Sequence, residues 1–176
     1  EYVTMPGYET MIPLAIENPR VVVARTFSKC FGMAGLRIGY AVAHKDTIAK
    51  LRAWEGIDAI SIMALQGAKS ALAVPQSWVA AEQQRNALAR AFTMKWFADR
   101  GYTPTDSQTN FMFIDIKRPS KGFREACASE GVLIGRDFPP YDATHARISV
   151  GTMADMQRAV KVFEQVLATP AKAAAA

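Results

Sequence analysis

The sequence predicts an α/β fold for the first part of the chain and an α+β fold for the second part. Two observations carry this prediction. Short apolar runs of strand length alternate with segments whose apolar residues recur at helical spacing. A long helical segment, with Pro75 near its start and Gly101 at its end, separates the two parts and would join them.

The first part contains few runs that predict strands, too few for a stable domain. In order, its expected elements are a short helix at 9–17, strands at 20–24 and 36–43, and helices at 45–54 and 61–73. The first strand is continuously apolar, which is typical of a strand buried on both faces in a parallel sheet. We therefore interpret residues 1–74 as the C-terminal portion of a larger domain with a mostly parallel sheet.

The second part, residues 75–170, predicts a small α+β domain that begins with the long helix. The further elements expected there are strands at 110–116, 132–134 and 147–150 and helices at 120–129 and 153–167. Ser120 precedes an apolar helical face and is interpreted as an N-cap. The alanine-rich end, residues 171–176, has low complexity and is expected to be a disordered tail.

Composition excludes several classes of protein. The 21 basic and 16 acidic residues give a net charge of +5, but the basic residues are scattered, so no nucleic-acid partner is expected. Cys30 and Cys127 lie far apart without metal-ligand spacing, so neither a disulfide framework nor a metal site is indicated and a reducing compartment is expected. No apolar stretch reaches the roughly 18 residues of a membrane span, so no membrane partner is expected either.

Lys29 lies in a segment whose residue types suit an aldehyde cofactor that carries a phosphate. Residues 26–40 read TFSKCFGMAGLRIGY and follow the first apolar strand. The lysine amine can bond to an aldehyde carbon, and Thr26, Ser28 and Arg37 can bind a phosphate. Alternatively, Lys29 is an ordinary surface lysine and Arg37 is a charge at the end of a strand.

Two arginines of the second part are candidates for binding an anionic substrate. Arg147 lies in the run ARISVGT, and a guanidinium can bind a carboxylate through two parallel hydrogen bonds. Its alternative role is a structural ion pair with Asp142 or Asp155. Arg136 ends the run GVLIGR and is either a substrate contact or an anchor of its loop.

Together these motifs resemble those of the fold-type I pyridoxal-phosphate-dependent aminotransferases of class I/II, and most closely the histidinol-phosphate aminotransferase-like group. The resemblance extends from Val21 to Leu167. It implies that Lys29 binds pyridoxal 5'-phosphate covalently and acts as the catalytic base. It also implies that Ser28 and Arg37 bind the cofactor phosphate, with Thr26 beside them.

For the second part, the resemblance implies that Arg147 holds the substrate carboxylate and that Arg136 lies near the far end of the substrate. Residues 1–74 would then belong to the cofactor-binding large domain. The implied protein is a cytoplasmic homodimer that transfers an amino group between an amino acid or histidinol phosphate and a 2-oxo acid. The extra Gly135 and the following FPPY run depart from the best-known histidine-pathway members, so histidine biosynthesis stays one option within amino-acid biosynthesis.

Two other functions remain open at this point. A pyridoxal-phosphate-dependent decarboxylase or lyase, similar to threonine-phosphate decarboxylase, would share the lysine and the arginines. A ligand-sensing domain of a regulator would share the fold without catalysis. In the family, the aspartate at the cofactor's ring nitrogen and the stacking aromatic ring precede the position of Glu1, so residues 1–176 alone are expected to be inactive.

Overall fold

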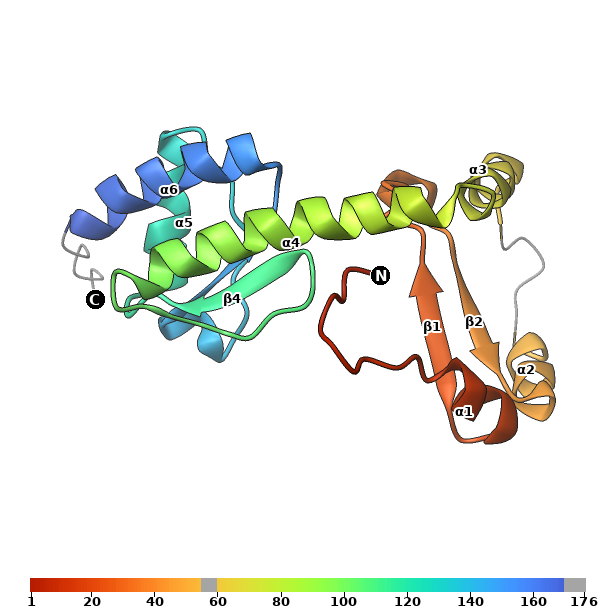
Figure 1. The fold of residues 1–176 in the computed structure, drawn as a ribbon. Helices are drawn as coiled ribbons and strands as arrows, with labels where there is room; N and C mark the ends of the chain where they lie inside the picture. Colours follow the sequence, from red (N-terminus) through yellow and green to blue (C-terminus); the bar gives the residue numbers. More distant parts are fainter. Residues whose placement is uncertain (55–59, 170–176) are drawn as a thin grey trace. The chain divides into compact units, whose positions relative to one another are not determined.

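The structure is a computed structural model that describes residues 1–54 and 60–169 (Figure 1). Its mixture of helices and strands confirms the predicted fold class. None of the described helices is long and apolar enough to cross a membrane. The tail predicted at 171–176 lies outside the described residues.

The chain forms two compact units, and each is described by itself. They comprise Glu1 with Met5–Ala81, and Tyr2–Thr4 with the chain from Glu82 onward. The division falls within the long helix α4, Gln76–Ala98. The sequence places the boundary between residues 74 and 75, just before this helix.

The first unit contains a two-stranded antiparallel ladder. Its elements are α1 Ile12–Glu17, β1 Val22–Thr26, a 3₁₀ turn Ala34–Leu36, β2 Gly39–Ala43, α2 Lys45–Arg52, α3 Ile62–Leu72 and the start of α4. Strand β1 pairs with β2 from Val22 opposite Ala43 to Thr26 opposite Gly39. The expectation of a strand buried on both faces is wrong for β1, because Val22 is 47% exposed. Only one described strand neighbours β1, so its apolar surface is incompletely covered.

Helix α3 packs its small residues against the segment between the two strands. Ala64, Ala68 and Ala71 are buried together with Phe27 and Ile38. Alanines keep the helix surface flat, so the neighbouring backbone can approach closely. The helix predicted at 61–73 is confirmed at Ile62–Leu72.

The second unit is a three-stranded antiparallel sheet covered on one face by helices (Figure 1). It contains β3 Thr103–Pro104, β4 Phe111–Asp115, α5 Ser120–Ser129, β5 His145–Ser149 and α6 Met153–Ala168, with strand order β3-β4-β5. The inward residues of the sheet pack with rings from α4, α5 and α6. Fully buried members of this core include Phe97, Met112, Ile114, Phe123 and Phe163.

Some local expectations for the second unit are wrong. Residues 132–134 form no strand, because only Gly135 donates a backbone hydrogen bond to β5 and Leu133 is 86% exposed. Ser120 is the first helical residue and Pro119 precedes it as the cap, so the Ser120 hydroxyl is free to bind elsewhere. The short strand β3 has no counterpart among the predicted elements.

Truncation of Phe163 should destabilise the protein strongly. Its ring is fully buried and lies 5.5 Å from the Phe123 ring and 5.7 Å from the Phe97 ring, centroid to centroid. We expect Phe163→Ala to lower the free energy of unfolding by about 3–5 kcal/mol. Leu88→Ala on α4 serves as control, since Leu88 is 54% exposed and the change should stay within about 0.5 kcal/mol. Urea denaturation followed by tryptophan fluorescence measures both changes, and equal losses would refute this account of the core.

Candidate functional site

Lys29 lies in the loop between β1 and β2, and this loop is closed by its own backbone. The Phe27 amide donates to the Ile38 carbonyl at 3.2 Å, and the Met33 amide donates to the Phe27 carbonyl at 3.0 Å. Phe27 and Ile38 are also buried against α3. The base of the loop is therefore fixed, while Lys29 itself is exposed.

The predicted phosphate-binding residues lie in this same loop. Thr26 and Ser28 are half-buried, and the Thr26 hydroxyl accepts a hydrogen bond from the Ser28 amide at 3.0 Å. Arg37 is exposed, and its guanidinium donates to the Ala34 carbonyl at 2.6 Å. Thr26 thus ends β1, while Ser28, Lys29 and Arg37 lie in the segment that joins β1 to β2.

Arg37 adopts an unusual backbone conformation. Its φ angle is 51°, in the left-handed region that residues with a Cβ atom rarely occupy. Such strain persists only where the surrounding structure imposes it, and it is concentrated at functional sites. Arg37 directly follows the 3₁₀ turn, and its left-handed backbone changes the direction of the chain shortly before β2 begins at Gly39.

The loop fits a phosphate-bearing aldehyde. Among the described residues, neither Lys29 nor Arg37 has a carboxylate partner, so both cations are available to an anion. Gly39 opens β2 where a Cβ atom would lie 2.5 Å from the Arg25 carbonyl oxygen, so only glycine allows the two strands to approach here. Hydroxyls, an amine and a guanidinium in a tight loop are the donor types that phosphate and aldehyde groups need.

The second group of predicted residues lies on the outer face of the three-stranded sheet. Arg147 of β5 is half-buried, and its guanidinium carbon lies 4.0 Å from the centroid of the Phe111 ring on β4. Arg136 is exposed, and its guanidinium carbon lies 4.8 Å from the Phe138 ring. Phe138 also lies 5.9 Å from the Arg147 guanidinium, so it neighbours both cations.

No acidic side chain in the described part of the chain forms an ion pair with Arg147. Burial lowers the pKa of Arg147 below its ordinary value, and the positive charge of Arg136 lowers this pKa further. The structural ion pair considered for Arg147 is not formed among the described residues. Asp155 instead accepts hydrogen bonds from Thr152 at the start of α6. The two arginines are consequently a local excess of positive charge that would bind a carboxylate or a phosphate.

The aromatic partners of the two arginines were not recognised as site residues from the sequence. Phe111 lies in the segment 110–116 that predicts a strand, and Phe138 begins the FPPY run after Arg136. The signal was weak, because a phenylalanine near an arginine in the sequence is common and only the folded chain shows which rings face which guanidiniums.

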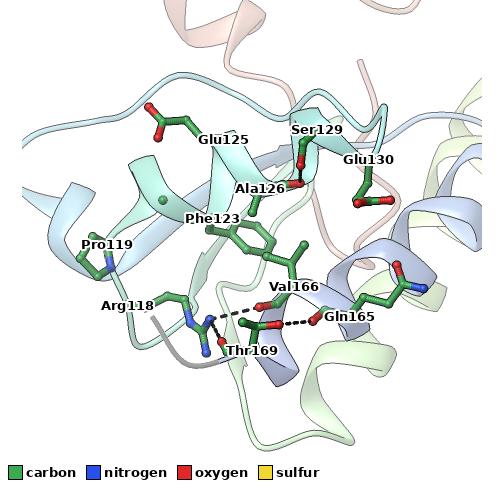
Figure 2. A pocket seen from close by; sticks show the side chains of 11 residues that line it. Arg118, Pro119, Phe123, Glu125, Ala126, Ser129, Glu130, Gln165, Val166 and Thr169 are labelled. Atoms are coloured by element: carbon green, nitrogen blue, oxygen red, sulfur yellow. Dashed lines mark hydrogen bonds between the residues drawn. The ribbon is translucent and has the colours of Figure 1, made fainter. Parts of the chain in front are cut away.

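Two cavities in the described part of the second unit are not lined by the predicted residues. One of about 560 Å³ lies between α5 and α6, where Figure 2 shows Arg118 reaching the last turn of α6. The Arg118 guanidinium donates to the carbonyls of Val166, Leu167 and Thr169 at 2.8–3.2 Å and thereby caps that helix. Another cavity, of about 310 Å³, lies between residues 131–134 and α6. Among the described residues, no group of histidine, cysteine or acidic side chains could hold a metal ion.

Comparison with known proteins identifies the family. The profile of aminotransferase class I and II matches residues 2–163, so the chain belongs to this family, whose members depend on pyridoxal phosphate. The histidinol-phosphate aminotransferase of Bacillus velezensis is 31% identical over 170 residues, which cover 95% of this chain and 46% of that protein. Histidinol-phosphate aminotransferase 2 of Methylococcus capsulatus is 31% identical over 168 residues, covering 95% of this chain and 45% of that protein.

Solved structures agree with this assignment. The histidinol-phosphate aminotransferase of Sinorhizobium meliloti, in complex with pyridoxal-5'-phosphate, is 27% identical with a TM-score of 0.79 and covers 89% of this chain and 44% of that one. L-threonine-O-3-phosphate decarboxylase of Porphyromonas gingivalis is 24% identical with a TM-score of 0.80, covering 96% and 52%, and shows a shared fold alone. The chain spans about half the length of the curated relatives it matches.

Two glycines of the loop provide a matched pair of substitutions. We expect Gly39→Ala to lower the free energy of unfolding by about 1–3 kcal/mol, because the new methyl group would overlap the Arg25 carbonyl. Gly35→Ala should be neutral, since no atom lies within 4 Å of the added Cβ. Thermal unfolding followed by circular dichroism compares the two variants. Equal stabilities would mean that the strands approach less closely than described.

Proposed function

We propose that the chain carries the cofactor-binding lysine and the substrate-binding arginines of a pyridoxal-phosphate-dependent aminotransferase. The reaction would transfer an amino group between an amino acid or histidinol phosphate and a 2-oxo acid. The observation that supports this most is Lys29, an exposed amine in a rigid, cation-rich loop that has no carboxylate partner among the described residues. Membership of the family supplies the cofactor.

In this proposal the residues of the first unit hold the cofactor. Lys29 provides the amine that bonds to it, and Thr26, Ser28 and Arg37 hold its phosphate. Arginine and hydroxyl donors suit a phosphate because each adds a charge-assisted hydrogen bond. When bound, pyridoxal phosphate supplies an electron sink for the pair of electrons released at the substrate Cα. Lys29 then holds and returns the proton at that carbon.

Arg147 and Arg136 would bind the anionic group of the substrate. A guanidinium binds a planar carboxylate through two parallel hydrogen bonds, which fixes the substrate in one orientation. One face of the substrate Cα is then presented to Lys29, the base. The relatives named as histidinol-phosphate aminotransferases support a phosphorylated amino alcohol as donor and histidine biosynthesis as the pathway. The unneutralised charge at the arginine pair is consistent with a phosphate.

We further propose that the intact protein is a cytoplasmic homodimer. Most large apolar side chains that are exposed among the described residues belong to the first unit, including Ile62, Met63 and Leu72 of α3 at 66–71% exposure. In the intact protein such a surface would be covered by the rest of the large domain and by a second subunit. Both cysteines are buried and neither forms a disulfide, which is compatible with a reducing compartment.

Borohydride reduction tests the assignment of Lys29. The intact protein is incubated with pyridoxal phosphate, reduced with borohydride to make the linkage permanent, and digested for peptide mass mapping. We expect one phosphopyridoxyl group, on Lys29, and an almost complete loss of labelling in Lys29→Ala. Lys45→Ala, which removes a lysine from the start of α2, should label like the unchanged protein. A label on another lysine would refute the assignment.

Kinetics of Arg147 variants test the substrate site. We expect Arg147→Lys to reduce kcat/KM for the preferred anionic donor by about 10- to 100-fold, because a lysine keeps the charge but loses the planar fork. Borohydride labelling of Lys29 should be unaffected, which separates substrate binding from cofactor binding. The donor panel consists of histidinol phosphate, phenylalanine and glutamate with 2-oxo acids as acceptors. Release of carbon dioxide in place of a 2-oxo product would identify a decarboxylase.

A further inference from the structure

The loop that carries Arg136 has no regular secondary structure, yet Arg136 lies between two fixed points. Residues 132–138 form neither helix nor strand. A charged side chain on such a loop would normally sample many positions, and binding a ligand would then cost conformational entropy. The residues on either side of Arg136 remove this freedom.

Gly135 provides the first fixed point. Its amide donates to the carbonyl oxygen of Arg147 at 2.9 Å. A Cβ atom at this position would lie 2.7 Å from the same oxygen, so the loop backbone contacts β5 directly. Arg136 directly follows the residue that contacts the backbone of Arg147, the other cation of the pair.

Asp137 provides the second fixed point, through a carboxylate that two side chains of α5 bind. The Ser120 hydroxyl donates to Oδ1 at 2.7 Å, and the Arg124 guanidinium donates from Nε to Oδ1 at 3.3 Å and from Nη2 to Oδ2 at 2.9 Å. Ser120 is only 3% exposed, and it begins α5, where the helix dipole also favours a negative charge. The hydrogen bond from Ser120 contributes most to lowering the pKa of Asp137, so the carboxylate is charged at neutral pH.

This arrangement has a consequence for charge as well as position. Because Ser120 and Arg124 occupy both oxygens of Asp137, the carboxylate is directed to α5 and makes no ion pair with the adjacent Arg136. Arg136 is therefore not paired with Asp137, and its guanidinium carbon lies 4.8 Å from the centroid of the Phe138 ring. The Phe138 ring also neighbours Arg147. The hydrogen bonds from Ser120 and Arg124 to Asp137, here called the clamp, therefore fix the backbone between Arg136 and Phe138.

We propose that Asp137 is a positioning residue, and that its clamp to Ser120 and Arg124 holds Arg136 and Phe138 beside Arg147 for a phosphate or carboxylate group of the substrate. This inference deepens the proposed function and rests on it for the identity of the ligand. The clamp itself belongs to the fold of the second unit and can be tested without any substrate.

The sharpest test removes an α5 side chain that binds Asp137 and leaves the sequence of the loop around Arg136 unchanged. Arg124→Gln removes the ion pair to Asp137, whereas Lys121→Gln removes a neighbouring charge of α5 that makes no hydrogen bond to Asp137 among those described. In the intact protein loaded with pyridoxal phosphate, Arg124→Gln should raise KM for histidinol phosphate about tenfold and leave kcat within about twofold. Lys121→Gln should change neither.

A second readout needs no activity. Trypsin can cut the bond after Arg136, and we expect Arg124→Gln and the milder Ser120→Ala to speed this cleavage about tenfold, measured by mass spectrometry of the peptides. Saturating inorganic phosphate should slow the cleavage in the unchanged protein and less in Arg124→Gln. Circular dichroism verifies that both variants fold.

The outcomes separate the clamp from the proposed function. Faster cleavage with a raised KM supports the inference. Unchanged cleavage in Arg124→Gln overturns it, and so does a fall in kcat with an unchanged KM. If Lys29 fails to label while cleavage after Arg136 still depends on Arg124, the proposed function fails and the clamp stands.

Discussion

The two faces of the short β4–β5 ladder determine the layout of the second unit. Side chains alternate along a strand, so Met112 and Ile148 enter the core while Phe111 and Arg147 of the same strands lie on the opposite face. A shift of β5 against β4 by one residue would turn Arg147 toward the apolar core and expose Ile148. The cost of burying an unpaired cation is large, so the core itself enforces the position of the candidate substrate arginine.

The cations of both units are held by groups that leave their charge intact. Arg37 donates to a backbone carbonyl, and Arg147 lies on an aromatic ring. A carboxylate partner would fix a guanidinium equally well but would compete with an anionic ligand. Carbonyl oxygens and ring faces orient the cation by weaker attraction and leave most of its hydrogen-bond donors for the ligand. Arg124 differs from both, because its guanidinium donates to the carboxylate of Asp137.

Local signals in the sequence predicted most of the helices and strands, and tertiary contacts explain the exceptions. Helix α5 begins and ends where its periodicity indicated, whereas the strand predicted at 36–43 begins only at Gly39, so that Leu36 and Arg37 lie in the segment before β2. The segment 132–134 has strand-forming residues, but the one backbone hydrogen bond described to β5 comes from the next residue, Gly135, which composition cannot reveal. The role of Ser120 likewise depends on Asp137, a residue that folding alone brings to the helix.

The loop around Lys29 illustrates why rigidity and strain occur together in a candidate active site. An exposed lysine is ordinarily mobile, and a defined position for its amine requires a fixed backbone. Phe27 and Ile38 supply this by joining the two ends of the loop and packing on the alanines of α3. The left-handed backbone of Arg37 costs on the order of 1–3 kcal/mol, and a loop without that packing would relax it. The flat alanine face of a neighbouring helix is therefore as necessary to the geometry of the lysine and the arginine as the motif residues themselves.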